Sequence, residues 1–344
     1  MSDPKIQALT EEENILKFTI SNLDTSVANS IRRIILSEIP LFVFKAFSTK
    51  DNESETIINI ISNTCKLHNE IIKQRLGCIP IHIDDEEFPY KDYIIELDEK
   101  NNDSTIKYVT SEAFKIKNVN NGKYLSDQQV KKIFPPDSIT GDFIEITKLN
   151  PPITKETNGE QLSLTSSISI SNAKEDGMYN VVSTCAYGNT EDKVKISDTW
   201  NEKRKELEKN KVSEEDIENE KKNWLLLEAK RIFIPNSFDF TIETIGIYSN
   251  MYLLVKSCDI MIEKCKLFME NIKNKESLVA YSENTLLKNE FTVTLENEDY
   301  TFGNVLTYFL YKNYYEGQQT VDFVGFRKPH PHIPNSIIRI DLID

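Results

Sequence analysis

Acidic side chains are the residues of this sequence with the clearest potential for catalysis, and their setting argues against it. Asp84, Asp85, Glu86 and Glu87 follow one another in a polar, turn-like segment, where solvation explains the carboxylates better than general acid–base chemistry. The sequence contains no GxGxxG, GxxxxGK(S/T), HExxH or GxSxG motif. We therefore expect a non-catalytic protein without a cofactor.

Cysteine and histidine, the usual metal ligands, are few and scattered. His330, Pro331 and His332 form a triplet that can in principle hold a metal ion, but no cysteine or third histidine lies nearby in the sequence. The five cysteines are odd in number and contain no CxxC pair, which indicates neither a disulfide framework nor a zinc knuckle. We expect no metal site and a reducing compartment.

The charge balance argues against a direct role in binding nucleic acid. The 344 residues include 41 basic and 55 acidic side chains, for a net charge of −14 that opposes contact with a polyanion. The length allows two or three domains. The polar N-terminus does not resemble a signal peptide, and no apolar run approaches the roughly 18 residues of a membrane span, so we expect a soluble, intracellular protein without membrane contact.

The stretch from Phe18 to Pro40 combines a strand with an amphipathic helix. Phe18 and its apolar neighbours predict the strand, and Thr25 or Ser26 is the expected helix cap. Apolar residues then recur at helical spacing up to Pro40, which ends the helix, while Arg32 and Arg33 lie off the apolar stripe. An ordinary amphipathic helix with two solvated arginines fits these residues too.

A second stretch near the C-terminus repeats the first in outline. Phe18–Ile20 corresponds to Phe291–Val293, and Ala28–Ile31 corresponds to Gly303–Leu306, with two extra residues between them in the second copy. Asp299 and Thr301 stand where the cap of the second helix is expected. Self-similarity of this kind is typical of two copies of one structural unit. Two such units can pair about a pseudo-twofold axis, so the chain has the pattern of a dimer fused end to end.

Five stretches of the sequence resemble a known family. NSIRRIILSEIP (29–40), RLGCIPI (75–81) and FTIETIGIYS (240–249) resemble the alpha-like assembly subunit of multisubunit RNA polymerases: bacterial alpha, archaeal D and the third-largest subunit of eukaryotic polymerase II. ENEDYTFGNVLTYFL (296–310), with VDFVGFRKPHPH (321–332), resembles the smaller partner, archaeal L or the eleventh-largest eukaryotic subunit. Fusions of this pair are a feature of some large DNA viruses.

The resemblance implies an α+β fold in which two alpha-like dimerisation units pair as a pseudo-heterodimer. Residues 1–45 and 176–275 would form a discontinuous D-type domain, interrupted by a mostly β inserted domain at 46–175. A linker at 276–290 would lead to an L-type domain at 291–344 that lacks the family's usual C-terminal helix.

The resemblance also implies a function. The chain would be an assembly platform on which the largest and second-largest catalytic subunits and small subunits of a DNA-directed RNA polymerase dock. If the protein is viral, it would act in the host cytoplasm and be carried in the virion; otherwise it would act in the nucleus. A DNA-binding transcription factor and an unrelated scaffold with the same fold are the alternatives.

Motif matches assign residues to the subunit interfaces. We expect Arg32 and Arg33 to bind carboxylates of a partner, Arg75–Gly77 to face the second-largest subunit, and His330–Pro331 to form a rigid turn toward the largest subunit. Asp299, Gly303 and Asn304 would shape the internal interface. The complete set is Asn29, Ile31, Arg32, Arg33, Ile35, Arg75, Leu76, Gly77, Asp299, Gly303, Asn304, Leu306, His330 and Pro331.

Residues 179–187 predict a strand, and residues 238–247 predict an alternating strand. Two further segments predict helices. Residues 200–231 alternate Lys and Glu, which is typical of a solvated helix, either continuous or interrupted; the alternative is a docking helix anchored by Trp200 and Trp224. Residues 250–272 carry a broad apolar stripe. In the family this is the long helix across the dimer interface, although a plain core helix fits the same residues.

Overall fold

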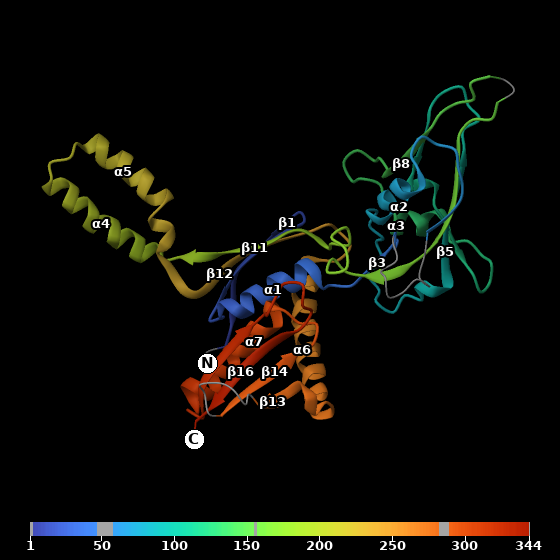
Figure 1. The fold of residues 1–344 in the computed structure, drawn as a ribbon. Coiled ribbons are helices and arrows are strands. Elements are labelled where there is room, and N and C mark those ends of the chain that lie inside the picture. The colour runs from blue at the N-terminus through green and yellow to red at the C-terminus, as the bar shows by residue number, and fades with distance from the viewer. Residues whose placement is uncertain (1–2, 47–57, 155–156, 282–288, 344) are drawn as a thin grey trace. The chain divides into compact units, whose positions relative to one another are not determined.

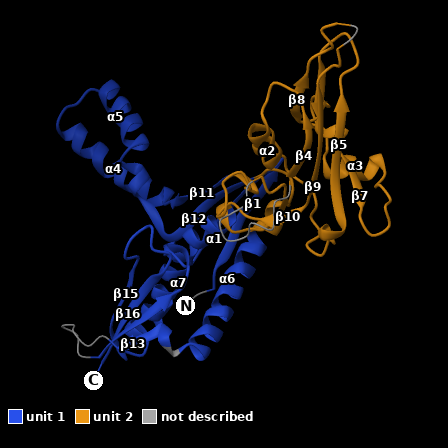
Figure 2. Ribbon diagram, turned by 45° about the vertical axis from the view of Figure 1, so that its right-hand side comes forward, with its two compact units in different colours: residues 1–35, 184–243, 254–344 blue, residues 36–183, 244–253 orange. Residues whose placement is uncertain are grey.

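The computed structural model describes residues 3–46, 58–154, 157–281 and 289–343. The chain divides into two compact units, shown in Figure 2. Unit 1 comprises residues 1–35, 184–243 and 254–344, and unit 2 comprises residues 36–183 and 244–253. Within the described ranges, no helix is both long enough and apolar enough to cross a membrane.

Unit 1 is built from two antiparallel four-stranded sheets and several helices (Figure 1). The first sheet has the order β1-β2-β12-β11, with bounds Lys5–Glu12, Ile15–Ser21, Phe233–Thr244 and Val182–Glu191. The second has the order β13-β14-β16-β15, with bounds Val279–Tyr281, Glu290–Leu295, Ser336–Leu342 and Val321–Arg327. The helices are α1 (Thr25–Ser37), α4 (Lys193–Lys209), α5 (Glu214–Leu226), α6 (Asn250–Asn274), α7 (Tyr300–Leu310), the π-helix η5 (Tyr311–Gly317) and the 3-10 turns η3 (Ala229–Arg231) and η4 (Glu276–Leu278).

In the first sheet, β2 alternates buried and more accessible residues, as a strand with one covered face requires. Phe18 lies opposite Phe240 of β12, and their rings stack with centroids 5.2 Å apart. On β2, Thr19 Oγ1 also donates a hydrogen bond of 2.7 Å to Asp239 Oδ1. The strand predicted from Phe18 onward is thus present.

The helix predicted after this strand is also present, but its predicted cap is wrong. Asp24 Oδ1 accepts a 2.8 Å hydrogen bond from the Ser26 backbone N–H. Thr25 and Ser26 already belong to the first turn, so Asp24 stands one residue earlier at the position where a side-chain oxygen can reach open amides. The helix ends at Ser37, before Pro40, because a proline disfavours helical geometry in the residue before it.

The second sheet repeats this order of strand, turn and helix. β14 pairs with β16 and leads to α7, whose cap is Asp299 as the sequence predicts. Leu295, Phe302 and Ile338 form the buried centre of this region. β13 falls in the segment predicted as a linker and pairs with β14 at the Val279–Val293 position.

α4 and α5 form a helical hairpin between β11 and β12, and the two helices lie side by side in Figures 1 and 2. Asp192 caps α4 by accepting from the Lys195 N–H at 3.0 Å, so the helix begins earlier than the charge pattern indicates. The sequence predicts a charged, interrupted helix here, and the break falls before Ser213, which caps α5.

Unit 2 contains the sheets β4-β9-β5-β7, β10-β3 and β6-β8 together with two helices. The strands are β3 (Leu41–Val43), β4 (Ile58–Asn63), β5 (Tyr93–Lys100), β6 (Lys107–Thr110), β7 (Lys115–Asn118), β8 (Glu145–Leu149), β9 (Gln161–Ser167) and β10 (Ser169–Ser171). The helices are α2 (Asn69–Gly77) and α3 (Asp127–Ile133), with 3-10 turns η1 (Tyr90–Asp92) and η2 (Ser111–Ala113).

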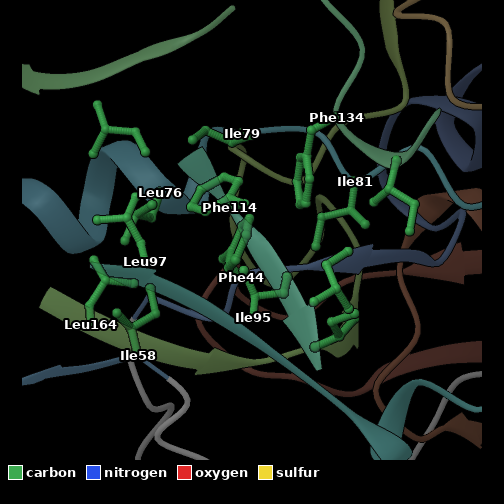
Figure 3. Packing of buried hydrophobic residues seen from close by; sticks show 14 of the residues in the cluster. Phe44, Ile58, Leu76, Ile79, Ile81, Ile95, Leu97, Phe114, Phe134 and Leu164 are labelled. Carbon is green, nitrogen blue, oxygen red and sulfur yellow. The ribbon is translucent and has the colours of Figure 1, made fainter. Parts of the chain in front are cut away.

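The core of unit 2 is aliphatic and aromatic (Figure 3). Three rings pack around one another: the Phe44 centroid lies 5.6 Å from Phe114 and 5.9 Å from Phe134, and those two rings are 4.8 Å apart. Leu76 of α2 is fully buried in the same cluster. Through Leu76, this core fixes the position of the Arg75–Gly77 motif within unit 2.

Two predicted strands are displaced in the structure. The strand expected over 179–187 is observed at Val182–Glu191, and the one expected over 238–247 is observed at Phe233–Thr244. Tyr179 lies outside the sheet because its ring is buried and its hydroxyl donates to the Phe44 carbonyl at 3.3 Å. Alternation of residue types identified these strands, but their ends depend on pairing with neighbouring strands, which the sequence of one segment does not record.

Candidate subunit interface

Arg33 links the two repeated segments within unit 1. Its Nη2 lies 2.7 Å from Asp299 Oδ2 and its Nε donates to Thr301 Oγ1 at 2.6 Å. The side chains of Arg33 and Asp299 are 40% and 34% exposed, so water screens part of their attraction. The last turns of α1 are therefore joined to the first turn of α7.

Asp299 serves two functions in this contact. Its Oδ1 accepts a 2.8 Å hydrogen bond from the Thr301 N–H and caps α7, while Oδ2 pairs with Arg33. A carboxylate at a helix N-terminus also interacts favourably with the helix dipole. The side chain that begins the second helix is thus also the one that binds the first.

Gly303 allows close packing between α7 and β15. A Cβ at this position would lie 2.0 Å from Cε2 of Phe326, a distance that real Cβ atoms do not tolerate. The Phe326 ring also makes an edge contact with Tyr300, with centroids 5.2 Å apart. Glycine is required here for the approach of a neighbouring ring.

α6 packs against the same C-terminal region. Met261, Cys265 and Phe268 contact the cluster centred on Phe302, and the rings of Phe268 and Phe302 meet edge to face at 5.5 Å. Lys264 pairs with Glu298 at 3.0 Å, and both side chains are largely buried at 15% and 20% exposure. The apolar stripe predicted for this helix therefore has a defined partner within unit 1.

Arg32 lies on a different side of α1 from Arg33. Its Nη2 donates to Asn29 Oδ1 at 3.4 Å, and its charge acts on Cys185 and Tyr187 of β11. Burial raises the pKa of Cys185 to about 12, and Arg32 opposes that shift. Burial likewise raises the pKa of Tyr187, against the effect of Arg32 and of a hydrogen bond from Asn29.

The Arg75–Gly77 motif lies in unit 2. Arg75 is exposed, and its Nη2 donates to the Glu145 carbonyl at 2.7 Å. Leu76 is fully buried. A Cβ at Gly77 would lie 2.6 Å from Met178 Sδ, so this glycine also permits a close contact. Of the three residues, only Arg75 is exposed.

The other predicted interface residues differ in accessibility. Ile31 and Ile35 are buried, and Leu306 packs against the C-terminal cluster, so these residues shape the surface without lying on it. Asn304, His330 and Pro331 are exposed. The His330 and His332 rings lie 5.0 Å apart, but no group of three potential metal ligands occurs among the residues that the structure describes.

Comparison with known protein families gives two separate matches, one over each of the two repeated segments. The family model described as the RNA polymerase Rpb3/Rpb11 dimerisation domain matches residues 17–265, and a second model of the same description matches residues 290–344. The chain belongs to this family. The Rpb3/Rpb11-type matches thus cover both strand-and-helix repeats and the first part of α6, up to residue 265.

Individual relatives are RNA polymerase subunits. The Rpo3 subunit of the RNA polymerase of Pyrococcus furiosus is 25% identical over 295 residues, covering 80% of this chain and 100% of the relative. The polymerases I and III subunit rpac1 of Dictyostelium discoideum is 37% identical over 87 residues, 25% of this chain. The chain covers only 22% of the length of that relative, and the human RPAC1 match, at 31% identity, has the same extent.

Sequence reasoning missed several contacts of this Rpb3/Rpb11-type chain. It did not identify Thr301 as the second partner of Arg33, nor the Lys264–Glu298 pair. Thr301 was visible only as a candidate cap, and the pair joins residues 34 positions apart. Neither has a local sequence signal, because both arise where helices from distant segments meet.

Proposed function

We propose that this protein is a non-catalytic assembly subunit of a multisubunit DNA-directed RNA polymerase, with the D-type and L-type partners in one polypeptide. In this role the chain forms its own pseudo-heterodimer and offers a surface on which the two large catalytic subunits dock. The domain limits of 1–45 with 176–275, 46–175 and 291–344 belong to this proposal, as does the origin of such a fusion in a large DNA virus.

The observation that carries the proposal is the contact of Arg33 with Asp299 and Thr301. It joins the helices of two segments that match dimerisation-domain models separately. The packing of α6 on the C-terminal cluster supports the same pairing. In a family of dimerisation domains, contacts of this kind are what a fused pair requires.

The described geometry refines the roles of the two arginines. We assign Arg33 to the internal interface, since its guanidinium already binds a carboxylate of the same chain. Arg75, Asn304 and the His330–Pro331 turn are exposed and become the candidates for contact with the large subunits. Arg32 is half-buried beside β11 and contributes at the edge of such a surface.

The test is affinity purification of the tagged chain from its native source, followed by mass spectrometry and a promoter-independent RNA synthesis assay. The proposal expects two very large subunits in the eluate together with RNA-synthesising activity. Recovery of the chain alone, or with DNA but without a polymerase, would overturn it and favour a DNA-binding factor.

A pair of variants tests the docking residues. Arg75→Glu reverses the charge of an exposed side chain, so we expect at least a tenfold loss of the recovered large subunits. Arg231→Glu makes the same change at a side chain that is 78% exposed and outside the proposed interface, and recovery should stay unchanged. Equal recovery with both variants would remove Arg75 from the interface.

A further inference from the structure

The α4–α5 hairpin has its own small core, which sets the shape of its surface. Trp200 and Trp224 are buried at 7% and 5% exposure, with ring centroids 5.5 Å apart, and they pack with Ile217 and Ala229. Lys203 Nζ pairs with Glu220 across the two helices at 2.7 Å. The tryptophans therefore hold the hairpin together and do not act as exposed docking anchors.

A groove of about 480 Å³ lies at the base of this hairpin, where α4 begins and α5 ends. Its apolar lining includes Ile196, Leu225 and an edge of Trp200. Leu225 is 41% exposed, and its neighbours Leu226 and Leu227 are 71% and 68% exposed, so apolar surface continues beyond the groove. Exposed leucines that follow one another are unusual on a solvated surface and are typical of binding sites.

The charged lining of the groove is mainly basic. Lys193, Lys221 and Lys230 face one acidic residue, Glu191, which forms an ion pair with Lys230. Two lysines thus remain in excess at this site, in a chain whose net charge is −14. The local charge is opposite to that of the molecule, which favours an anionic partner at this position.

We propose that this groove is a docking site for an acidic peptide segment of another polypeptide, with one large apolar residue as its anchor. The apolar floor accepts the anchor, and the lysine rim binds flanking carboxylates. A nucleic acid backbone would satisfy the lysines but would leave the leucines uncovered. None of its lining residues, which all lie between 191 and 230, belongs to the set proposed for the polymerase interface.

The experiment measures binding of defined peptides to the full chain by fluorescence anisotropy. The probe is a labelled 12-residue peptide with six Asp or Glu residues and a central Leu or Phe. Two comparison peptides carry either the acids without the anchor or the anchor without the acids, and a single-stranded oligonucleotide represents polyanions. We expect saturable binding only for the complete peptide, with an affinity that falls as salt is added.

Neighbouring lysines provide a matched control. Lys221→Glu, which reverses a charge in the groove, should weaken binding of the complete peptide at least tenfold, whereas Lys222→Glu on the exposed side of α5 should change it less than twofold. Leu225→Asp should abolish the preference for an apolar anchor. Absence of binding, equal loss with both lysine variants, or tighter binding of the oligonucleotide would overturn the proposal. Since no large subunit is present, the outcome is independent of polymerase assembly.

Discussion

The two repeated segments of unit 1, β2–α1 and β14–α7, share an order of elements but differ in how their helices are packed. α1 buries aliphatic residues, including Ala28, Ile31 and Ile34, whereas α7 buries the ring of Phe302 and has glycine where α1 has Ala28. The same backbone unit is thus filled by small aliphatic groups in one copy and by aromatic rings in the other.

Their charged residues differ in a complementary way. Arg33 lies toward the C-terminal end of the first helix, Asp299 caps the second, and these two side chains meet at 2.7 Å. Two identical copies would place like charges at equivalent positions, which would not select one pairing over another. Divergence of the copies therefore makes the contact between unlike halves specific.

The largest effect that distinguishes the two segments is expected at Gly303. An exposed glycine in the middle of a helix normally gains about 1 kcal/mol of stability on substitution by alanine. Here Gly303→Ala should instead destabilise the protein by about 2 kcal/mol, because the new Cβ would overlap the Phe326 ring. Urea unfolding followed by circular dichroism measures the difference.

The control for Gly303 uses the ring itself. When Phe326 is first replaced by alanine, the new methyl group of Gly303→Ala meets no ring. The free energy of unfolding should then stay unchanged or rise. At the corresponding position of the first segment, Ala28→Gly should destabilise by about 1 kcal/mol or somewhat more, through lost helix propensity and a buried methyl group. If Gly303→Ala stabilises the otherwise unchanged chain, the close approach of Phe326 does not limit this position.

A smaller effect is expected from the charge pair between the segments. Arg33→Ala removes the bonds to Asp299 and Thr301, while Asp299→Asn keeps a capping oxygen but removes the charge. A double-mutant cycle of these two changes should give a coupling free energy of about 0.5–1 kcal/mol, since both side chains are more than a third exposed.

The matched comparison is Arg32→Ala with the same Asp299→Asn change. Arg32 faces β11, so its coupling to Asp299 should be close to zero. Raising the salt concentration should reduce the Arg33 coupling and leave that of Arg32 unaffected. Equal coupling of both arginines would mean that the measured energy reflects the net charge of the helix and not the observed contact.

Much of the order of elements could be predicted from the sequence, because periodicity and caps are local. The α7 cap at Asp299 and the strand at Phe18 were predicted from such signals. The sequence places the α1 cap at Thr25 or Ser26, one or two residues too late, since Asp24, Thr25 and Ser26 all have capping side chains. Only the backbone conformation distinguishes them, because the capping residue is the one with non-helical φ and ψ angles.

The candidate interface was less predictable than the fold. The sequence motif assigns Arg32 and Arg33 the same role, binding carboxylates of a partner. Adjacent residues of a helix, however, point about 100° apart and meet different neighbours. One binds Asp299 and the other lies beside Cys185. Which arginine would be internal depended on the packing of segments more than 260 residues apart, and no local pattern records that packing.

The smallest effect on stability at neutral pH is expected from the Cys185 thiol beside the first helix. Burial raises the pKa of Cys185 from an ordinary 9.0 to about 12, so at pH 8 its thiolate fraction is roughly a thousandfold lower than that of an ordinary thiol. The thiolate is the reactive form, and we expect iodoacetamide to modify Cys185 at least tenfold more slowly than the exposed Cys78. The reaction is followed by peptide mass spectrometry, with urea-unfolded protein as the control in which both cysteines should react alike.

The direction of the pH dependence follows from the same shift. Below pH 9 the thiol of Cys185 is protonated in the folded and the unfolded chain, so it causes no change of stability with pH there. Between about pH 9 and 12 the unfolded chain loses this proton first, and the free energy of unfolding should fall as the pH rises. Cys185→Ala should make that fall less steep. A slope that is the same in the variant would mean that the thiol already ionises in the folded protein, and that Arg32 outweighs burial beside the first helix.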